Sequence, residues 1–140
     1  MAQVISIVDG DSIVVRLNGK NVEVRLWGID TPEWQQSYAK AAKTFVRKRL
    51  SGRKVGLVAK DWDKYGRMVA LVRTQDGRLI NEELVRSGLA WVHVYYCRND
   101  LRCDQWKQLE KEARQSGIGL WQEKEPLPPW QWKRLQRNNS

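Results

Sequence analysis

The stretch "VISIVDGDSIVVRLNGKNVEVRLWGID" (residues 4–30) decides the fold, because three strand patterns follow one another in it. β-Branched residues recur through residues 4–8, 13–17 and 22–29. Asn18 and Gly19 predict a two-residue hairpin turn, since a type I′ turn needs positive φ at both positions. The Asp-Gly-Asp turn at 9–11 is of similar character. We therefore expect an antiparallel meander at the start of the chain.

The hydrophobic period changes after the proline turn. In "SYAKAAKTFVRKRLSG" (residues 37–52), apolar residues fall near one face of a helix, with Ser37 placed to cap it and Gly52 to end it. These apolar residues are Tyr38, Ala41, Ala42, Phe45, Val46 and Leu50. Residues 54–80 then return to strand-like runs, separated by the polar loop 61–67. Two more strands are expected there.

The last third of the chain predicts short helices at about 81–87 and 104–115. Beyond them, the prolines of "EPLPPWQWKR" predict an extended tail over 122–140, packed on the domain or trailing from it. Trp130 and Trp132 either pack on the surface or stack on bases. We expect one domain over 1–121, mainly β with α (α+β): a five-stranded Greek-key barrel of the OB type with about three helices.

Charge points to a polyanionic partner. The chain has 140 residues, and its 25 Lys and Arg against 16 Asp and Glu give a net charge of +9. Such a balance favours nucleic acid as the partner, although a merely solubilised basic surface is an open alternative. No apolar run approaches the ~20 residues that span a bilayer, so we expect no membrane partner.

The first residues and the two cysteines bear on location. The opening "MAQVISIVDGD" shows no basic leader, apolar region or cleavage site. This fits a cytoplasmic protein or a mature segment with a new Met1. Cys97 and Cys103 are spaced wrongly for a zinc knuckle but suitably for a small disulfide loop. A bridge would imply an oxidising compartment, and two buried thiols are the equal alternative.

Carboxylates gather at one end of the predicted meander. Asp9 and Asp11 lie at the first turn, and Asp30 follows the third strand. Because the start of strand two and the end of strand three meet at the same end of the sheet, Asp11 and Asp30 can share one site. Two carboxylates with turn carbonyls suit Ca²⁺ better than Zn²⁺. The alternatives are a turn residue at Asp11 and a strand-end cap at Asp30.

Three further charged residues are candidates for phosphodiester chemistry. Glu33, held by Pro32, is placed to act as general base, unless it caps the next helix. Arg25 lies five residues before Asp30, so on a straight strand it would point to the opposite face; a bulge near Gly28 would bring it in. Arg67 suits bidentate contact with phosphate.

Each of these assignments has a simpler counterpart. Arg67 could be a surface arginine that pairs with Asp63. Aromatic residues with a neighbouring lysine could stack on a single strand or pack on the barrel rim. These residues are Lys64, Tyr65, Tyr95 and Tyr96. Because His93 is the one histidine, two-imidazole attack through a 2′-hydroxyl is unavailable, so cleavage should not require RNA.

Five motifs occur in one order that resembles the thermonuclease family, the staphylococcal nuclease-like proteins. They are "VDGDS" (8–12), "RLWGIDTPE" (25–33), "DKYGR" (63–67), "NEELVRSGLA" (81–90) and "GLW" (119–121). The resemblance covers roughly residues 4–121. It implies an OB barrel and Ca²⁺-dependent hydrolysis of DNA and RNA that leaves 3′-phosphate ends.

The resemblance also implies roles for individual residues. Asp11 and Asp30 match the calcium carboxylates, with the Thr31 carbonyl as a further ligand and Asp9 as a supporting acid. Glu33 matches the residue that activates or orients water. Arg25 and Arg67 match the pair that binds phosphate, and the family's arginine on this strand faces the site. Lys64, Tyr65 and Tyr96 are the expected nucleic-acid contacts.

The sequence also departs from the family pattern. Val94 stands where a second tyrosine is expected beside Tyr96, and the loop between Glu33 and the helix is short. Residues 97–121, followed by "PPW" (128–130), look like the Gram-negative and plasmid-borne branch, whose members commonly carry a secretion signal.

These features complete the expected partners and location. We expect a periplasmic or secreted monomer, with a cytoplasmic location still open, that acts on DNA and RNA and prefers single strands. The competing functions are a non-catalytic OB-type module that binds single-stranded nucleic acid, and an oligosaccharide-binding barrel, which the net charge of +9 disfavours.

Overall fold

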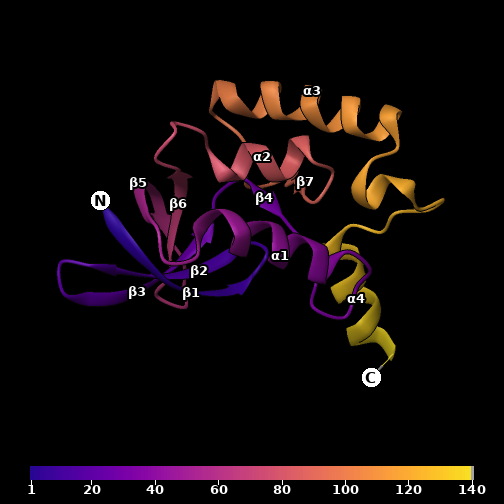
Figure 1. Ribbon diagram of the computed structural model, residues 1–140. Coiled ribbons are helices and arrows are strands. Elements are labelled where there is room, and N and C mark those ends of the chain that lie inside the picture. Colours follow the sequence, from indigo (N-terminus) through magenta and orange to yellow (C-terminus); the bar gives the residue numbers. More distant parts are fainter. Residues whose placement is uncertain (140) are drawn as a thin grey trace.

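Five strands close into a barrel in the computed structural model, which describes residues 1–139. The strands are β1 (Ala2–Asp9), β2 (Ser12–Leu17), β3 (Lys20–Leu26), β5 (Lys54–Trp62) and β6 (Met68–Arg73), and they neighbour one another in the order β1-β2-β3-β6-β5. Strands β1 and β5 close the barrel, and β3 with β6 is a parallel pair among antiparallel ones. The predicted five-stranded α+β barrel is confirmed (Figure 1).

The first hairpins follow from the sequence as expected. Asn18 and Gly19 have φ of 52° and 80° and join Leu17 to Lys20, which are paired across β2 and β3. Alternate residues of these strands point into the barrel, where Val15 and Val24 have no exposed surface. This period-2 burial is what fixes the register of the meander.

The third predicted strand is broken at Gly28. Strand β3 ends at Leu26, a turn follows, and β4 (Ile29–Asp30) pairs with β7 (Trp91–Val92) in a separate sheet. Gly28 has a φ of +80°, and a Cβ there would meet Trp106 at 3.0 Å and the Cys97 sulfur at 3.2 Å. The prediction of one continuous strand over residues 22–29 is therefore wrong. The chain turns at Gly28, where only glycine accepts the positive φ and the close contacts.

Residues 1–139 contain four α-helices, α1 (Ala39–Leu50), α2 (Ile80–Arg86), α3 (Leu101–Ser116) and α4 (Pro129–Asn139), with a 3-10 turn at Gly119–Gln122. Helices α2 and α3 pack on each other at one end of the molecule, whereas α1 lies against β1 (Figure 1). No helix within residues 1–139 is long and apolar enough to cross a membrane.

Three predicted helix details are wrong. Helix α1 begins after Tyr38, which has a φ of 71°, so Ser37 does not cap it. Helix α3 begins at Leu101, three residues earlier than predicted, because the Asp100 side chain accepts the N–H of Arg102 as a cap. The tail is helical from Pro129, since proline at a first helical position loses no hydrogen bond.

The Cys97–Cys103 pair, left open by the sequence, forms a disulfide. It ties the loop after β7 to the first turn of α3, beside Gly28. Trp106, three residues after Cys103, is fully buried with its ring centroid 5.8 Å from that of Trp27. Bridge and indole pair form the layer that supports the Gly28 turn.

Candidate active site

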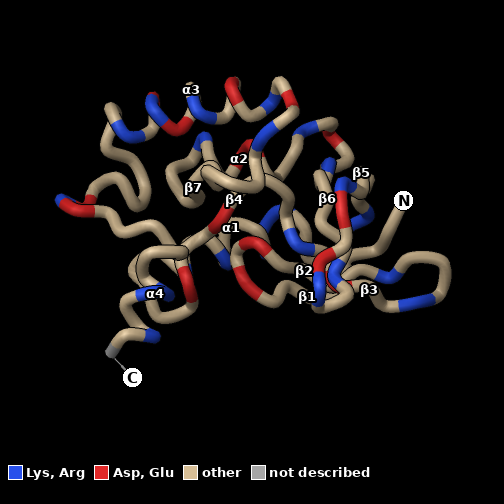
Figure 2. The backbone as a smooth tube through the Cα atoms, turned by 180° about the vertical axis from the view of Figure 1, so that it is seen from behind, with Lys and Arg blue, Asp and Glu red and all other residues tan. Residues whose placement is uncertain are grey.

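Three carboxylates meet where β1, β2 and β4 approach one another. The Asp11 carboxylate accepts the backbone N–H of Thr31 at 2.9 Å, and the Asp9 carboxylate accepts the N–H of Asp11 at 3.1 Å. Gly10 lets this turn come close, because a Cβ there would lie 2.8 Å from the Ala42 Cβ of α1. The structure thus fastens the first turn to the segment that carries Asp30, and acidic positions lie beside β4 in Figure 2.

Arg25 lies between the two buried aspartates. Its Nη2 is 3.1 Å from Asp30 Oδ1 and 3.4 Å from Asp11 Oδ2. Its Nη1 donates to the carbonyl oxygens of Leu26 at 2.9 Å and Ile29 at 3.1 Å. The straight-strand expectation for Arg25 is wrong, because the turn at Gly28 interrupts the alternation; the chain is broken there rather than bulged.

Burial and mutual repulsion set the ionisation of the carboxylates. Burial, and then the neighbouring Asp11, raises the pKa of Asp30 to about 8 and that of Asp9 to about 7. Burial would also raise the pKa of Asp11, but Arg25 and hydrogen bonds from its neighbours hold it at about 2. The Arg25 guanidinium is itself buried, yet Asp11 and Asp30 raise its pKa. Near neutral pH the ionised Asp11 carboxylate therefore lies 3.4 Å from the positively charged Arg25 guanidinium.

Glu33 follows β4 and is tied to the C-terminal helix. Its Oε1 lies 3.0 Å from Lys133 Nζ, and its backbone N–H donates to the Gln36 side chain at 2.9 Å. Gln36 in turn donates to the Leu127 carbonyl at 2.9 Å. Burial alone would lower the pKa of Lys133, but the hydrogen bond to Glu33 and the negative charge of Glu33 raise it. After Asp11, Asp30 and Asp9, Glu33 also contributes to the raised pKa of Arg25, so its charge lies near this guanidinium.

Sequence reasoning missed Lys133, because the tail was expected to be extended. A usable signal exists: Pro129 suits a first helical turn, and Trp130 and Lys133 are three residues apart, so they share a helix face. Trp130 packs with its ring centroid 4.8 Å from His93 and 5.9 Å from Trp91. Of the two readings left open for Trp130, packing is the one that the structure shows.

Arg67 makes the surface pairing that was the simpler alternative. Its Nε lies 2.7 Å from Asp63 Oδ2 and 3.6 Å from Glu23 Oε2. Glu23 and Arg25 are two residues apart on β3 and so lie on the same face. Arg67 is therefore on the face of Arg25, although within residues 1–139 its ion pairs are with Asp63 and Glu23 rather than with the carboxylates of the site.

The expected nucleic-acid contacts are exposed. Tyr65 lies with the Lys64 Nζ 5.3 Å from its ring centroid, and Tyr96 has its centroid 4.4 Å from His93. The His93 Nδ1 accepts the backbone N–H groups of Tyr95 and Tyr96 at 3.1 and 3.4 Å. Burial, with Arg25 and Lys133 nearby, lowers the pKa of His93 to about 4. His93 is thus a neutral support for the tyrosine loop.

A metal would have to bind with few protein side chains. Within residues 1–139, no group of three or more His, Cys, Asp or Glu side chains is arranged to hold one. Asp11, Asp30 and Thr31 are all buried at the same place and offer oxygen donors only. This donor chemistry suits a hard cation that takes its remaining ligands from water or phosphate.

The sequence that forms this candidate site is similar to the sequences of known proteins. Residues 23–123 match the family described as "Staphylococcal nuclease homologue". An "Uncharacterized endonuclease" of Escherichia coli O157:H7 is 36% identical over 131 residues, which cover 94% of this chain and 83% of that protein. The "Micrococcal nuclease" of Shigella flexneri is 33% identical over 145 residues, covering 97% and 82%.

A plant relative covers less of its own length. The "Staphylococcal-like nuclease CAN1" of Arabidopsis thaliana is 35% identical over 121 residues, which are 86% of this chain and 36% of that protein. The match to the family spans most of the chain and includes the segments of Arg25, Asp30, Glu33 and Arg67. The chain therefore belongs to the staphylococcal nuclease family and is a phosphodiester-hydrolysing nuclease.

Proposed function

We propose that this nuclease is calcium-dependent and sugar-nonspecific, and that it cleaves DNA and RNA to leave 3′-phosphate ends. The observation that carries the proposal is the buried arrangement of Arg25 between Asp11 and Asp30, at 3.4 and 3.1 Å. A fixed guanidinium beside oxygen donors is suited to a phosphodiester that must be neutralised before water can attack it.

Calcium fits the donors that the chain provides. Asp11, Asp30 and the Thr31 carbonyl would hold the ion, with Asp9 supporting the Asp11 backbone through its 3.1 Å hydrogen bond. Two crowded carboxylates favour a divalent cation, and Ca²⁺ accepts an irregular oxygen shell of about 6–8 ligands. When bound, the ion would supply charge neutralisation to the phosphate.

The side chains of the site would divide the remaining work. Arg25 is held in one orientation by the Leu26 and Ile29 carbonyls, so its Nε–H, and its Nη2 after leaving Asp30, would be presented to phosphate oxygens. Arg67 would add a second guanidinium after leaving Asp63. Both arginines would stabilise the charge that develops on the phosphoryl oxygens.

Glu33 would act as general base. It takes a proton from water as the water oxygen bonds to phosphorus and the bond from phosphorus to O5′ breaks. O5′ would take up a proton from solvent as it leaves, so the products are a 3′-phosphate and a 5′-hydroxyl, and Glu33 would then return its proton to solvent. Because the Lys133 ion pair occupies Oε1 of Glu33, the base must share or exchange this partner during turnover.

Contacts to the nucleic acid follow from the exposed aromatic residues. Tyr65 and Tyr96 are largely exposed, at 72% and 70%, and present faces on which unpaired bases can stack. Lys64, beside Tyr65, would contact the backbone phosphates. This arrangement supports a preference for single strands. His93 is engaged with the tyrosine loop, which supports cleavage without a 2′-hydroxyl.

A plasmid-nicking assay tests the proposal. We expect nicking with Ca²⁺, its loss with EGTA, and its return when Ca²⁺ is added again. Fragment 3′ ends should resist extension by a polymerase until a phosphatase treats them, because they carry phosphate. Cleavage that persists in EGTA, or ends that extend at once, would refute the calcium requirement or the product assignment respectively.

The disulfide supports a place outside the reducing cytosol. Bridges persist in oxidising compartments, so Cys97–Cys103 favours a periplasmic or secreted enzyme. We propose that it acts there as a monomer. Thiol alkylation of the enzyme from fractionated host cells, followed by mass spectrometry, would leave both cysteines unalkylated if the bridge is present and alkylate them only after reduction. Light scattering would give the mass of one 16.4 kDa chain.

A further inference from the structure

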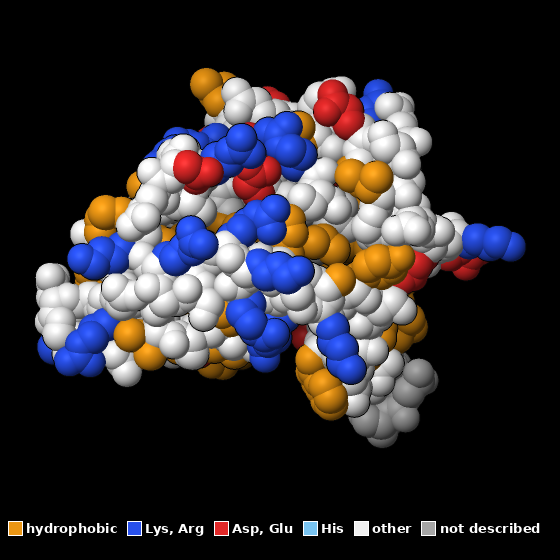
Figure 3. Space-filling view, in the orientation of Figure 1, with side chains coloured by type: hydrophobic (Ala, Val, Ile, Leu, Met, Phe, Trp, Pro, Cys, Tyr) orange, Lys and Arg blue, Asp and Glu red, His pale blue; other side chains and the backbone are white. Residues whose placement is uncertain are grey.

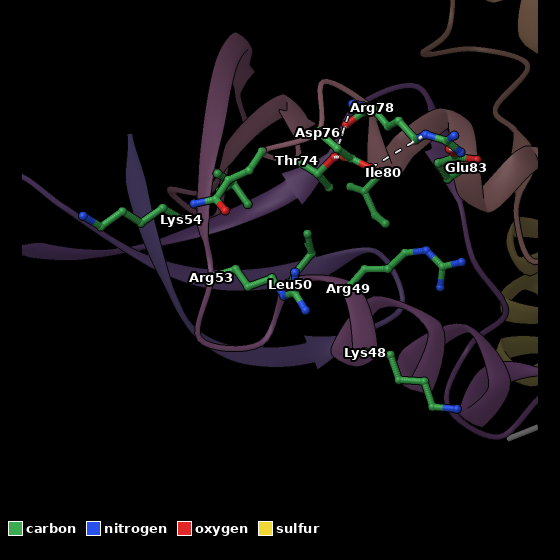
Figure 4. A pocket seen from close by; sticks show the side chains of 12 residues that line it. Lys48, Arg49, Leu50, Arg53, Lys54, Thr74, Asp76, Arg78, Ile80 and Glu83 are labelled. Atoms are coloured by element: carbon green, nitrogen blue, oxygen red, sulfur yellow. Dashed lines mark hydrogen bonds and ion pairs between the residues drawn. The ribbon is translucent and has the colours of Figure 1, made fainter.

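A groove of about 510 Å³ lies away from the catalytic residues, between the end of α1, the start of β5 and the loop from β6 to α2. Figure 4 shows long basic side chains from these segments around its opening. The basic residues that line it are Lys48, Arg49, Arg53, Lys54 and Arg78. The buried side chains of Leu50, Val55 and Ile80 form its floor.

Most of the positive charge of the groove is uncompensated. Its two carboxylates are already engaged by an arginine: Arg78 lies 3.8 Å from Asp76 and 3.0 Å from Glu83. Within residues 1–139, no carboxylate lies within 4.0 Å of the Lys48, Arg53 or Lys54 amino or guanidinium nitrogens. Basic side chains that line one groove repel one another unless an anion lies among them, and in Figure 4 the Lys54 and Lys48 side chains extend outward on opposite sides of it.

One cation of the groove is held in place. The Arg49 guanidinium carbon lies 3.5 Å from the centroid of the Phe45 ring, a cation–π contact within α1. The ring covers one face of the planar guanidinium, and Nη1 donates a long hydrogen bond of 3.5 Å to the Phe45 carbonyl, so the remaining N–H groups can meet an acceptor. Part of the ordering cost of binding an anion is thereby already met.

Helix α1 connects this groove to the catalytic site. Its first half contacts the Gly10 turn through Ala42, and its end carries Lys48 and Arg49. The helix contains no acidic residue, and its further basic residues are Lys40, Lys43 and Arg47. Lys54 pairs with Gln3, six residues from Asp9 on β1, so the groove lies roughly 20 Å from the carboxylates.

The surface between the two sites is basic. In Figure 3, Lys and Arg side chains gather across the face on which α1 lies. No aromatic side chain lines the groove within residues 1–139, so it offers contacts to phosphates rather than to bases. We propose that the groove is a second binding site for the phosphate backbone of the polynucleotide whose scissile bond lies in the catalytic site.

Such a site would strengthen the binding of long substrates but not of short ones. A tetranucleotide whose scissile bond lies in the catalytic site has only about two nucleotides on the groove side, or roughly 7 Å at about 3.4 Å per phosphate along a stacked strand, whereas a 30-nucleotide strand is long enough to reach the groove. Phosphate contacts release counterions, so removing one contact to a single strand makes the slope of log K against log salt shallower by about 0.7. The inference rests on the nucleic-acid substrate of the proposed function and is independent of calcium.

The test compares two triple variants of equal charge. The groove variant is Lys48→Gln/Arg53→Gln/Lys54→Gln, and the control Lys107→Gln/Lys111→Gln/Lys124→Gln neutralises exposed lysines of α3 and the loop before α4. Fluorescence anisotropy of a labelled 30-nucleotide single strand in EDTA measures binding without cleavage. Hydrolysis of the 30-mer and of a tetranucleotide is then measured with Ca²⁺, and melting temperature reports the fold.

We expect the groove variant to bind the 30-mer at least about tenfold more weakly near 0.1 M salt, with a salt slope shallower by about two. Its kcat/KM for the tetranucleotide should stay within about twofold, and the control should bind within about threefold of the parent. Equal weakening by both variants, or equal loss on both substrates, would overturn the proposal. Failure of calcium to support cleavage would refute the proposed function and leave the anisotropy comparison valid.

Discussion

Lys133 Nζ lies 3.0 Å from Glu33 Oε1, so the C-terminal helix places a cation on the carboxylate that is assigned as general base. The contact is reinforced by Trp130 against His93 and by the hydrogen bond from Gln36 to the Leu127 carbonyl. Burial and Asp11 raise the pKa of Asp30, and the charges of Arg25 and Lys133 oppose that rise, so Lys133 lies near the proposed calcium carboxylates. Helix α4 is therefore part of the site.

Replacing Lys133 by Met should tighten calcium binding. The change removes a cation that repels the metal ion, an effect on the order of 1 kcal/mol or about fivefold in affinity. The half-saturating Ca²⁺ concentration for cleavage should fall accordingly. Lys133→Arg, which keeps the charge, should leave it unchanged. An unaltered calcium requirement in Lys133→Met would show that Lys133 has no electrostatic role there.

The variant Arg25→Lys should lose at least about a hundredfold in kcat, because it keeps a charge but loses the planar fork that contacts both phosphate and carboxylate. Asp30 can remain protonated near neutral pH, with its pKa at about 8, so the fold should survive. Single-turnover kinetics with a melting curve checks both statements. Turnover within about tenfold of the parent in a folded Arg25→Lys would remove Arg25 from the chemistry.

Arg67→Ala should reduce kcat by about a hundredfold or more while leaving stability nearly unchanged, since exposed ion pairs contribute about 0–1 kcal/mol. The matched control is Arg86→Ala, which breaks the ion pair with Glu83 at 3.4 Å on α2; Arg86 does not line the basic groove. Near-parental turnover in Arg67→Ala would contradict the role of a second phosphate-binding guanidinium.

His93 should destabilise the fold at acidic pH. Its pKa is lowered to about 4 from an ordinary 6.5, so the stability that its neutral form contributes is complete above pH 6.5 and is lost as pH falls toward 4. The loss is at most about 3 kcal/mol. Urea unfolding between about pH 4 and 7.5 measures it.

The control for this pH effect is His93→Asn, whose side-chain oxygen can still accept the N–H groups of Tyr95 and Tyr96 but does not titrate. The difference between the two proteins isolates His93 from Asp9 and Asp30, whose raised pKa values are about 7 and about 8. Parallel stability curves for parent and His93→Asn would show that His93 does not titrate in this way.

Local patterns predicted the barrel well, because burial with period 2 and the Asn18-Gly19 turn act over short distances. They also placed Asp11 and Asp30 at one end of the meander, where the structure brings them together around Arg25. Strand alternation failed for Arg25, because it assumes an unbroken strand and Gly28 resets the backbone.

The C-terminal segment shows a different limit. The rule that proline breaks helices holds for helix interiors, and Pro129 lies at the first position. The contacts that hold α4, such as Trp130 on His93, join distant parts of the chain and leave no periodic trace in the sequence. The disulfide was undecided for a similar reason, since spacing allows a bridge without requiring one.

The Gly28 turn links the candidate active site to the packing beneath it. A Cβ at this position would meet both Trp106 and the Cys97 sulfur, so the indole and the disulfide pack against the turn that places Arg25 beside Asp30. Moving "RLWGIDTPE" into another barrel would therefore transfer these side chains without the packing that orients them. A functional graft must also include α3 and the disulfide.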